Sequence, residues 1–448
     1  MKNKALFKDF ARYVSLSVLG QIALSCYTLA DTFFVSAKLG ANGLTALNLA
    51  FPIFCIINGI GLMIGIGGGT KYSIYRSREE SDKANRVFTN ALYIAAIFAC
   101  VFVLAGVFFS KYIVKFLGAD ETVLEMTNTY AQVMLLFAPA FLLNNLLQCF
   151  IRNDGNPSLS MAAMITGSLS NVLLDYIFIF PLDMGIFGAI FATGLAPIIS
   201  ICVLSPYLVK RKNRFRFVKS RLSGTFAKEI LSSGFSPFLT EATSGVVMFL
   251  FNFIILRITG NIGVAAFGVI SVISLVVIAI YTGLSQGAQP VMSSNHGANN
   301  SENVKTVLEY SLITMLILSG IIYATVFFGA SGLTSIFNSE KNQALQALAE
   351  TGLKLYFIAC PFIGFNIVMS TYFISTEKPL YAQIISLSRG FIVLIPTAFL
   401  LASLFEMTGV WCTYPTSECI VTVIGLMLYV ISKRRNDRQL AKTNSNVS

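Results

Sequence analysis

Long apolar runs separated by short polar stretches recur along the whole chain. Each run has roughly 20 or more residues, enough for an α-helix to cross about 30 Å of hydrocarbon. Only helices and closed barrels satisfy the backbone polar groups inside a membrane. Barrel strands need short alternating segments, whereas AIFACVFVLAGVFF (96–109) is continuously apolar. The pattern therefore predicts an all-α membrane protein.

Twelve transmembrane helices are expected from these runs. They cover about 12–36, 44–70, 88–109, 128–150, 159–182, 186–208, 230–256, 264–292, 306–328, 351–374, 380–403 and 409–432.

The second half of the chain resembles the first when the two are laid over each other. The stretch GLMIGIGGGTKYSIYRSREESDKANRVFTNAL (61–92) lies over GLSQGAQPVMSSNHGANNSENVKTVLEYSL (283–312), with Gly61 on Gly283. Two six-helix lobes follow, in the same orientation because six is even, and an axis along the membrane normal should relate them. The expected domains are an N-lobe (1–209), a cytoplasmic basic linker (210–229), a C-lobe (230–432) and a cytoplasmic tail (433–448).

Charge is scarce and unevenly placed. Only 12% of the residues are charged, against about 25% in soluble domains. The N-terminal tail, the even-numbered connections and the C-terminal tail hold 25 of the 32 Lys and Arg. This bias places both termini in the cytoplasm of a multi-pass cell-membrane protein. The largest basic block, KRKNRFRFVKSR (210–221), should contact anionic lipid headgroups rather than nucleic acid.

Nothing in the chain points to an enzyme. The single histidine, His296, excludes a multi-His metal site, and the HExxH, GxSxG and phosphate-loop motifs are absent. We therefore expect no catalytic residues and no cofactor.

Five ionisable side chains stand well inside the spans: Asp31, Asp175, Glu241, Arg389 and Glu418. Each costs at least about 2.5 kcal/mol at the bilayer centre, so such residues usually mark an ion or substrate path. Asn171 lies one helical turn before Asp175, so the two share a face. Oxygen-rich ligand sets suit hard cations, and Thr193 could add a hydroxyl. The alternative is that these groups are structural hydrogen-bonding partners between helices.

The remaining charges belong to the second half. Glu241 overlies Gln21 when the two halves are aligned, and both are candidates for a substrate or proton site. Arg389 and Glu418 lie on the last two spans, one on each. We expect them to form a structural ion pair, because a buried charge without its partner is costly.

The chain resembles the multidrug and toxic compound extrusion (MATE) family, in particular its bacterial and archaeal drug-efflux branch. The resemblance rests on YTLADTFFVSAKLG (27–40), on RNDGNPSLSM, SNVLLDYIFIF and GIFGAIFAT within 152–193, and on QPVMSSNHGA (289–298). It implies twelve helices in two lobes and efflux of bulky, often cationic drugs in exchange for H⁺ or Na⁺. The family usually has a proline early in the first helix, but YVSLSVLGQI has none, so a proline bend is not implied here.

The resemblance also implies a site for the coupling ion in the N-lobe. Asp31, Asn171, Asp175 and Thr193 match the family positions that form it. Hydroxyl and amide ligands beside two acids permit Na⁺ but do not exclude protons. The expected partners are small-molecule drugs or organic cations and membrane lipid, without nucleic acid, for a protein that acts as a monomer.

Three other functions remain open. A flippase for lipid-linked oligosaccharides or lipids, from the same fold superfamily, would favour cationic groups in its central cavity. The embedded charges here are four acids against one Arg, which favours cationic cargo. A channel or receptor is disfavoured because no re-entrant filter segment interrupts the spans. The other large twelve-span transporter superfamily is disfavoured because its Asp-Arg-Gly-Arg-type loop is missing.

Overall fold

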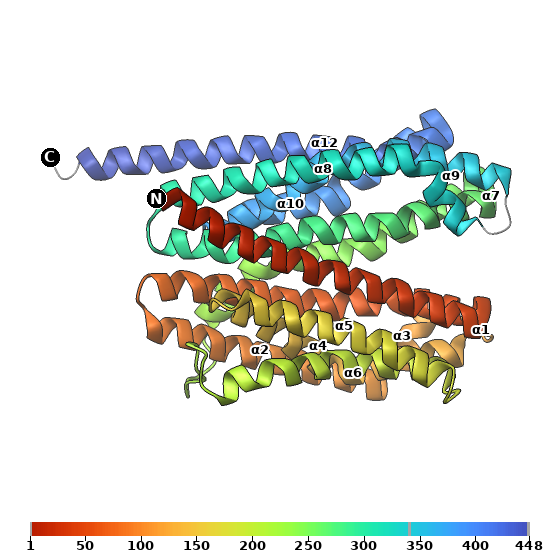
Figure 1. The fold of residues 1–448 in the computed structure, drawn as a ribbon, viewed down its shortest axis with the longest axis horizontal. Helices are drawn as coiled ribbons and strands as arrows, with labels where there is room; N and C mark the ends of the chain where they lie inside the picture. Colours follow the sequence, from red (N-terminus) through yellow and green to blue (C-terminus); the bar gives the residue numbers. More distant parts are fainter. Residues whose placement is uncertain (1, 339–341, 446–448) are drawn as a thin grey trace.

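Long, nearly parallel helices make up the protein (Figure 1). The computed structural model describes residues 2–338 and 342–445, and within these residues no β-strand forms. The elements are α1 (Lys2–Ser77), α2 (Ser81–Phe108), α3 (Ser110–Phe116), α4 (Leu124–Asn153), α5 (Pro157–Ile179), α6 (Gly185–Val209), α7 (Gly224–Gly297), α8 (Ser301–Phe337), α9 (Gln343–Tyr356), a 3-10 turn (Phe357–Ala359), α10 (Cys360–Ser375), α11 (Pro379–Leu387), a π-helical turn (Ser388–Ile392) and α12 (Leu394–Ser445).

Three of these elements contain one non-helical residue at which two spans meet, and in α12 the first of these spans already begins at α11. That residue is Gly40 in α1, Gly260 in α7 and Glu406 in α12. Ten segments of the described chain are long and apolar enough to cross a membrane, and the segments 224–297 and 379–435 each contain one of these breaks. The twelve predicted spans are therefore confirmed.

Several helices extend beyond the predicted spans. Helix α1 begins at Lys2 rather than near residue 12, and α8 covers Ser301–Phe337 rather than 306–328. Hydropathy marks only the part of a helix that is apolar enough for hydrocarbon, whereas the backbone hydrogen bonds continue into the polar ends.

The backbone repeats the sequence symmetry. Gly40 and Gly260 have almost the same conformation, with φ 62° and 65° and ψ −152° in both. Gly185 and Glu406 also match, with φ 58° and 50°, and they join the last two spans of each half. Equivalent turns thus occur at corresponding positions in the two halves, as expected for two lobes built on one plan.

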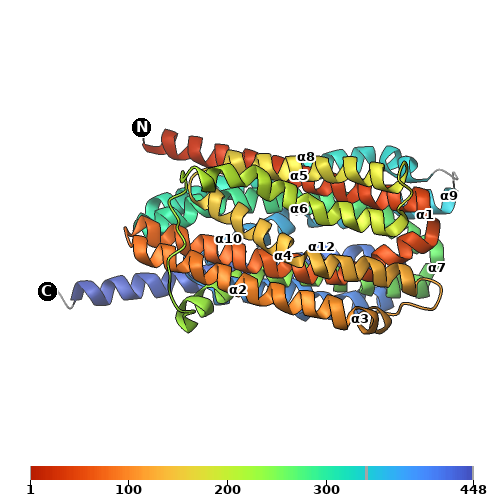
Figure 2. The same ribbon diagram turned by 90° about the horizontal axis from the view of Figure 1, so that it is seen from below.

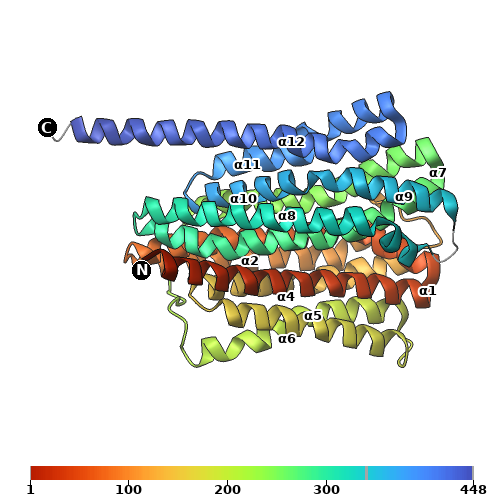
Figure 3. The same ribbon diagram turned by 45° about the horizontal axis from the view of Figure 1, so that its top comes forward.

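The two lobes lie side by side along their length. Helices α1 to α6 form one lobe and α7 to α12 the other (Figures 1 and 3). Helix α6 ends at Val209 and α7 begins at Gly224, so the second part of the predicted linker 210–229 is already helical. The division into these domain boundaries stays a prediction.

The basic linker is held against the N-lobe. It crosses the end of the molecule that carries both termini (Figure 2). Side chains of α2 accept hydrogen bonds from its backbone: Asn85 from the amide of Arg216 at 2.8 Å, and Asn90 from that of Ser223 at 2.8 Å. The linker backbone is therefore fixed by polar side chains of α2, while its Lys and Arg side chains remain available to the solvent or to headgroups.

Glycines allow the lobes to touch backbone to backbone. A Cβ on Gly234 of α7 would lie 1.8 Å from the carbonyl oxygen of Met63 in α1, and one on Gly67 would lie 2.1 Å from that of Ile230. Small residues permit this kind of approach between membrane helices. The second span of α1 and the first span of α7 therefore form a close inter-lobe crossing.

Candidate functional site

A polar cluster lies inside the N-lobe, between α5 and α6. Asn171 and Asp175 are fully buried, and Thr193 is 5% exposed. In the amide orientation that gives both atoms of Asn171 a partner, its nitrogen donates to Asp175 Oδ2 at 3.1 Å. Its oxygen then accepts from the backbone N–H and the hydroxyl of Thr193, at 3.2 and 3.3 Å. Three of the four predicted coupling-ion residues are thus in direct contact.

Asp31 approaches this cluster from α1. It is 6% exposed and lines a cavity together with Thr193, Tyr27 and Tyr130. Thr193 lines this cavity with Asp31, and through Asn171 it is connected to Asp175. Each has one carboxylate oxygen, Oδ1, that lacks a hydrogen-bond partner in the described part of the chain. Two buried carboxylates with orphaned oxygens repel each other when both are charged, so a cation or a proton would stabilise them.

The donor set restricts the ion. No group of three or more His, Cys, Asp or Glu side chains that could hold a metal occurs among residues 2–338 and 342–445. Two carboxylates with amide and hydroxyl oxygens suit hard cations rather than soft transition metals.

Arg389 and Glu418 are in contact within the C-lobe. Arg389 lies on the π-helical turn Ser388–Ile392. Its Nε donates to both Glu418 oxygens at 2.9 and 3.0 Å, and its second terminal nitrogen, Nη2, donates to Oε1 at 2.8 Å. Asn366 adds a donor to Glu418 Oε2 at 2.7 Å. Both charges are therefore neutralised inside the lobe.

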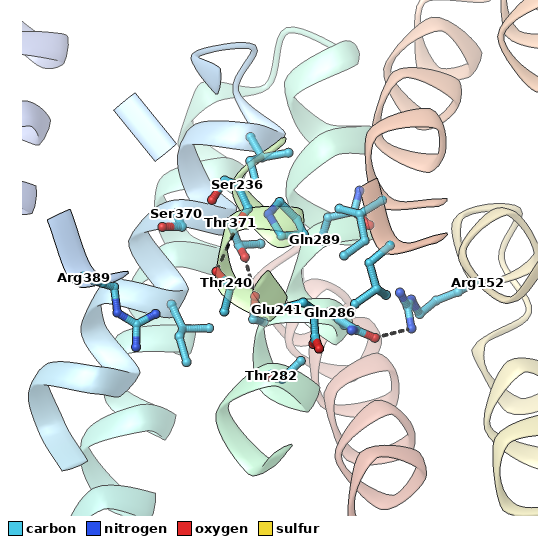
Figure 4. Close-up of a pocket in the computed structure, with 16 residues that line it drawn as sticks. Arg152, Ser236, Thr240, Glu241, Thr282, Gln286, Gln289, Ser370, Thr371 and Arg389 are labelled. Atoms are coloured by element: carbon cyan, nitrogen blue, oxygen red, sulfur yellow. Dashed lines mark hydrogen bonds between the residues drawn. The ribbon is translucent and has the colours of Figure 1, made fainter. Parts of the chain in front are cut away.

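A cavity of about 680 Å³ lies between the two lobes. Its polar lining residues are Arg152, Ser236, Thr240, Glu241, Thr282, Ser285, Gln286, Gln289, Ser370, Thr371 and Arg389 (Figure 4). Glu241 lies midway along the first span of α7 rather than near its start, and its carboxylate is in hydrogen-bonding contact with Asn58. Gln21 is not among the lining residues, but its amide donates to Gln286 Oε1 at 3.1 Å.

Two buried cationic residues were missed from the sequence. Arg152 is 2% exposed and Lys71 is 9% exposed. They follow the predicted spans 128–150 and 44–70, which places them in connections, but α4 continues to Asn153 and α1 to Ser77. The stretch Gly155-Asn156-Pro157, which follows α4 and begins α5, is the signal that could have placed Arg152 on a helix.

Arg152 also corrects the balance of embedded charges. The comparison of four acids with one arginine is wrong for the central cavity, because Arg152 and Arg389 both line it beside a single acid, Glu241. The preference for cationic cargo cannot be derived from that count.

Four residues from both lobes meet at the end that carries the termini. We refer to Lys71, Arg78, His296 and Glu377 as the Glu377 cluster. Glu377 accepts from Lys71 at 2.7 Å and from Arg78 at 2.5 Å, and His296 Nε2 lies 3.5 Å away. The hydrogen bond from His296, with those from Lys71 and Arg78, holds the pKa of the Glu377 carboxyl well below its usual range.

Further inter-lobe contacts connect this cluster to the cavity. Gln289 of α7 donates to Thr70 of α1 at 3.0 Å and to Asn153 of α4 at 3.1 Å. The backbones of Gly297 and Ile74 are in close contact. The lobes are thus held together between the cavity and the end with the termini.

Both halves of the chain match the model of a known protein family. The family model described as MatE matches residues 17–177 and 238–400. It therefore matches once in each half, at positions that correspond in the internal repeat.

Individual proteins are similar over nearly the full length. The chain is 24% identical to the multidrug export protein MepA of Staphylococcus saprophyticus, over 97% of this chain and 96% of the relative. It is 24% identical to MepA of a Staphylococcus aureus strain, over 96% and 95%.

Solved structures show the same fold. An outward-facing multidrug resistance MATE family transporter of the MOP superfamily superimposes with a TM-score of 0.91, at 22% identity and 96% coverage of both chains. A MOP superfamily transporter from Pyrococcus furiosus, described as having a binding pocket of reverse polarity, gives 0.89, at 23% identity and 95% coverage of both.

Proposed function

The chain belongs to the MatE family, and we propose that it is a secondary active multidrug exporter that exchanges bulky, often cationic organic compounds for H⁺ or Na⁺. The similarity to multidrug export proteins supports the export function. The observation that carries the antiport proposal is the pair Asp31 and Asp175. Both are buried, and each keeps one carboxylate oxygen without a partner in the described chain.

The proposed coupling ion binds at Asp31, Asp175, Asn171 and Thr193. Helix α1 supplies Asp31, and the same span packs its Val14 and Val18 against Gly287 and Gly283 of the C-lobe. No proline interrupts α1 between these positions. Neutralising the carboxylates therefore allows the N-lobe helices to repack, and the continuous helix carries that change to the lobe interface.

Antiport requires the ion and the drug to favour different states of the same pair of lobes. In our proposal the drug leaves from the central cavity when the ion binds, and the loaded N-lobe then carries the ion inward. Glu241 lines the cavity and is a candidate for contact with the cargo or for a second protonation. Gln21 is the other candidate; it does not line the cavity but donates a hydrogen bond to the lining residue Gln286.

The wider assignment rests on the same family. The relatives are membrane transporters, and we propose that this chain acts as a monomer in the plasma membrane, without enzymatic activity, a cofactor or nucleic acid. Both termini and the basic linker would face the cytoplasm and its anionic lipid. In that orientation the Glu377 cluster and the hydrogen bonds of Gln289 close the lobe interface on its cytoplasmic side.

The lipid-linked oligosaccharide or lipid flippase remains the second candidate, because Arg152 places a cation in the central cavity. Arg389 gives it no support, since its guanidinium is already bound to Glu418.

Dye flux into liposomes tests the proposal. Purified protein is reconstituted, and ethidium movement is driven by a pH gradient or by a Na⁺ gradient, for wild type and Asp175→Asn. Flux that needs one gradient and is lost in the variant supports the antiporter and identifies its ion. Absence of flux under either gradient would contradict it, and lipid-linked substrates would then be assayed.

A further inference from the structure

The segment between α6 and α7 is bound to the N-lobe through its backbone. Three alternate amides donate to N-lobe side chains: Arg214 to Asp154 Oδ2 at 2.9 Å, Arg216 to Asn85 at 2.8 Å and Val218 to Thr89 at 3.0 Å. A spacing of two residues places amides on the same side of an extended chain. A fourth amide, that of Ser223, donates to Asn90 at 2.8 Å. The segment therefore follows a fixed path along the N-lobe.

The acceptors on α2 are oriented by bonds within their own helix. The Thr89 hydroxyl donates to the backbone carbonyl of Asn85 at 3.1 Å, and the Asn90 amide nitrogen donates to that of Arg86 at 2.8 Å. The oxygens of Thr89 and Asn90 are thereby left to accept from the linker. Both side chains are buried, and buried polar groups are costly to leave without partners. Release of the linker from α2 is therefore unfavourable.

Asp154 joins the same segment to two other helices of the N-lobe. Its Oδ1 accepts from the Tyr72 hydroxyl of α1 at 2.5 Å, and its Oδ2 accepts from the Tyr207 hydroxyl of α6 at 2.8 Å. The same Oδ2 accepts from the amide of Arg214. Hydrogen bonds to a carboxylate are stronger than those between neutral groups. One side chain thus fastens the beginning of the linker to α1 and α6.

Phe215 adds an apolar anchor between the first two bound amides. Its side chain is fully buried. Its ring centroid lies 4.6 Å from that of Phe88 on α2, 5.7 Å from that of Phe150 on α4 and 5.9 Å from that of Tyr72 on α1. Withdrawal of the ring would expose this apolar surface to water. All of these partners belong to the N-lobe, so the apolar anchor and the hydrogen bonds tie the linker to one lobe.

The bound segment ends where α7 begins (Figure 2). Ser223 is extended, with φ −102° and ψ 122°, and Gly224 is the first residue of the helix. Gly224 is exposed, and among the described residues no atom beyond its chain neighbours and the local helix backbone lies within 4 Å of the position a Cβ would take. Glycine also adopts backbone conformations that other residues avoid. Rotation at this position is therefore unobstructed.

The proposed antiport requires the two lobes to change their relative position. Resting on that function, we infer that residues 213–223 move as part of the N-lobe and that the covalent hinge between the lobes is the junction Ser223–Gly224. Rotation there keeps the four linker amides bound, whereas a bend inside the linker would break at least one of these bonds or expose Phe215. Helix α7 thus turns about a fixed point on the N-lobe, and the linker is not a slack tether.

Hydrogen–deuterium exchange resolved to single amides tests whether the linker is fixed. In purified protein in nanodiscs, the amides of Arg216 and Val218 should exchange at least about tenfold more slowly than that of Phe217, which lies between them on the other side of the chain. Asp154→Asn should speed exchange at Arg214 by about tenfold, because a charge-assisted bond is lost. Exchange at Arg216 and Val218 as fast as at Phe217 would overturn the inference.

The same measurement on Glu377→Gln tests whether the linker stays with the N-lobe. This substitution loosens the lobe interface at the Glu377 cluster, where Lys71 and Arg78 lose their shared charge. Because opening of the interface does not use the linker bonds, the four amides should exchange as slowly as in wild type. Faster exchange of these amides in Glu377→Gln would mean that the linker leaves the N-lobe when the lobes separate, contrary to the inference.

Proline substitutions locate the hinge. Proline suits the first position of a helix, and Ser223 already has the extended conformation required before it. Gly224→Pro should therefore preserve the midpoint of thermal unfolding and the binding of ethidium, but lower gradient-driven ethidium flux by about tenfold or more. Lys219→Pro is the matched control, because it restricts an exposed residue inside the fixed segment, and it should change flux by less than about twofold.

Undiminished flux in Gly224→Pro, or an equal loss in Lys219→Pro, would contradict a hinge at Ser223–Gly224. The exchange measurements on wild type and Glu377→Gln do not depend on the proline variants. Absence of ethidium flux in wild type would instead contradict the proposed export function, and exchange would still decide whether the linker is fixed to the N-lobe.

Discussion

Lys71 and Glu377 join the two lobes through a contact of 2.7 Å between Nζ and Oε1, although 306 residues separate them in the chain. Arg78 and His296 approach the same carboxylate. Glu377 is 26% exposed at its side chain and Lys71 is 11% exposed, so the pair is screened less than a surface ion pair. This cluster closes one end of the lobe interface.

Replacing Glu377 should loosen that end. Glu377→Gln removes the charge that Lys71 and Arg78 share and that His296 contacts, and we expect a loss of about 1–2 kcal/mol of stability. The midpoint of thermal unfolding in detergent would fall, and spin labels placed on the two lobes at this end would report longer distances. Glu309→Gln is the control, because its pair with Lys305 is exposed. Equal effects of the two substitutions would contradict this role.

The contribution of Glu377 should depend on pH in one direction. Its pKa is lowered in the folded protein, so the stabilisation is complete above the ordinary carboxyl pKa of about 4.3. It is lost as the pH falls further, toward the lowered value. The difference in unfolding midpoint between wild type and Glu377→Gln should stay constant from pH 8 to 5 and shrink below that. The comparison is repeated with His296→Gln in both proteins, so that titration of the imidazole beside Glu377 does not contribute. A difference in unfolding midpoint that grows on acidification would refute the expectation.

Neutralising either N-lobe carboxylate should stop coupled transport. Asp31→Asn and Asp175→Asn remove a charge that the ion must bind, but they keep the shape of the side chain. We expect loss of gradient-driven ethidium flux with normal expression and an unchanged gel-filtration profile. Asp183→Asn, in an exposed pair with Lys38, should transport like wild type. Retained export by both N-lobe variants would show that the coupling site lies elsewhere.

Breaking the C-lobe ion pair should destabilise that lobe. Glu418→Ala leaves the Arg389 guanidinium buried without its three hydrogen bonds, a change that typically costs about 3–5 kcal/mol. The double variant Arg389→Met with Glu418→Leu should recover much of that loss, because no bare charge remains. The midpoints of thermal unfolding of wild type, Glu418→Ala and the double variant are compared. A double variant that is less stable than Glu418→Ala would argue against a mutual pair.

A methyl group at Gly234 should separate the lobes. The added carbon of Gly234→Ala would overlap the Met63 carbonyl oxygen, and relieving such a clash typically costs about 1–3 kcal/mol. Gly245→Ala on the same helix is the control, because among the described residues no atom beyond its chain neighbours and the local helix backbone lies within 4 Å of the position its methyl group would occupy. Lower thermal stability and altered flux in the first variant alone are expected. A similar loss in both would mean that the effect does not come from the inter-lobe contact, because alanine by itself favours a helix over glycine.

The amino-acid sequence by itself determined the twelve spans, the repeat that relates the two halves and the acids that interrupt apolar runs. Hydropathy and periodicity are local properties, and a carboxylate within oily residues is visible without a fold. Asn171 and Asp175 were expected to share a face because they are one helical turn apart, and they are in contact.

Only the tertiary structure decided which charges face the central cavity. Arg152 and Lys71 look like loop residues until the length of their helices is known, and Glu377 acquires its partners only when the lobes pack together. Contacts across 134 residues, as between Arg152 and Gln286, or across 306, as between Lys71 and Glu377, depend on how two separate bundles meet. No local pattern encodes that meeting, because it is set by backbone contact at residues such as Gly67 and Gly234.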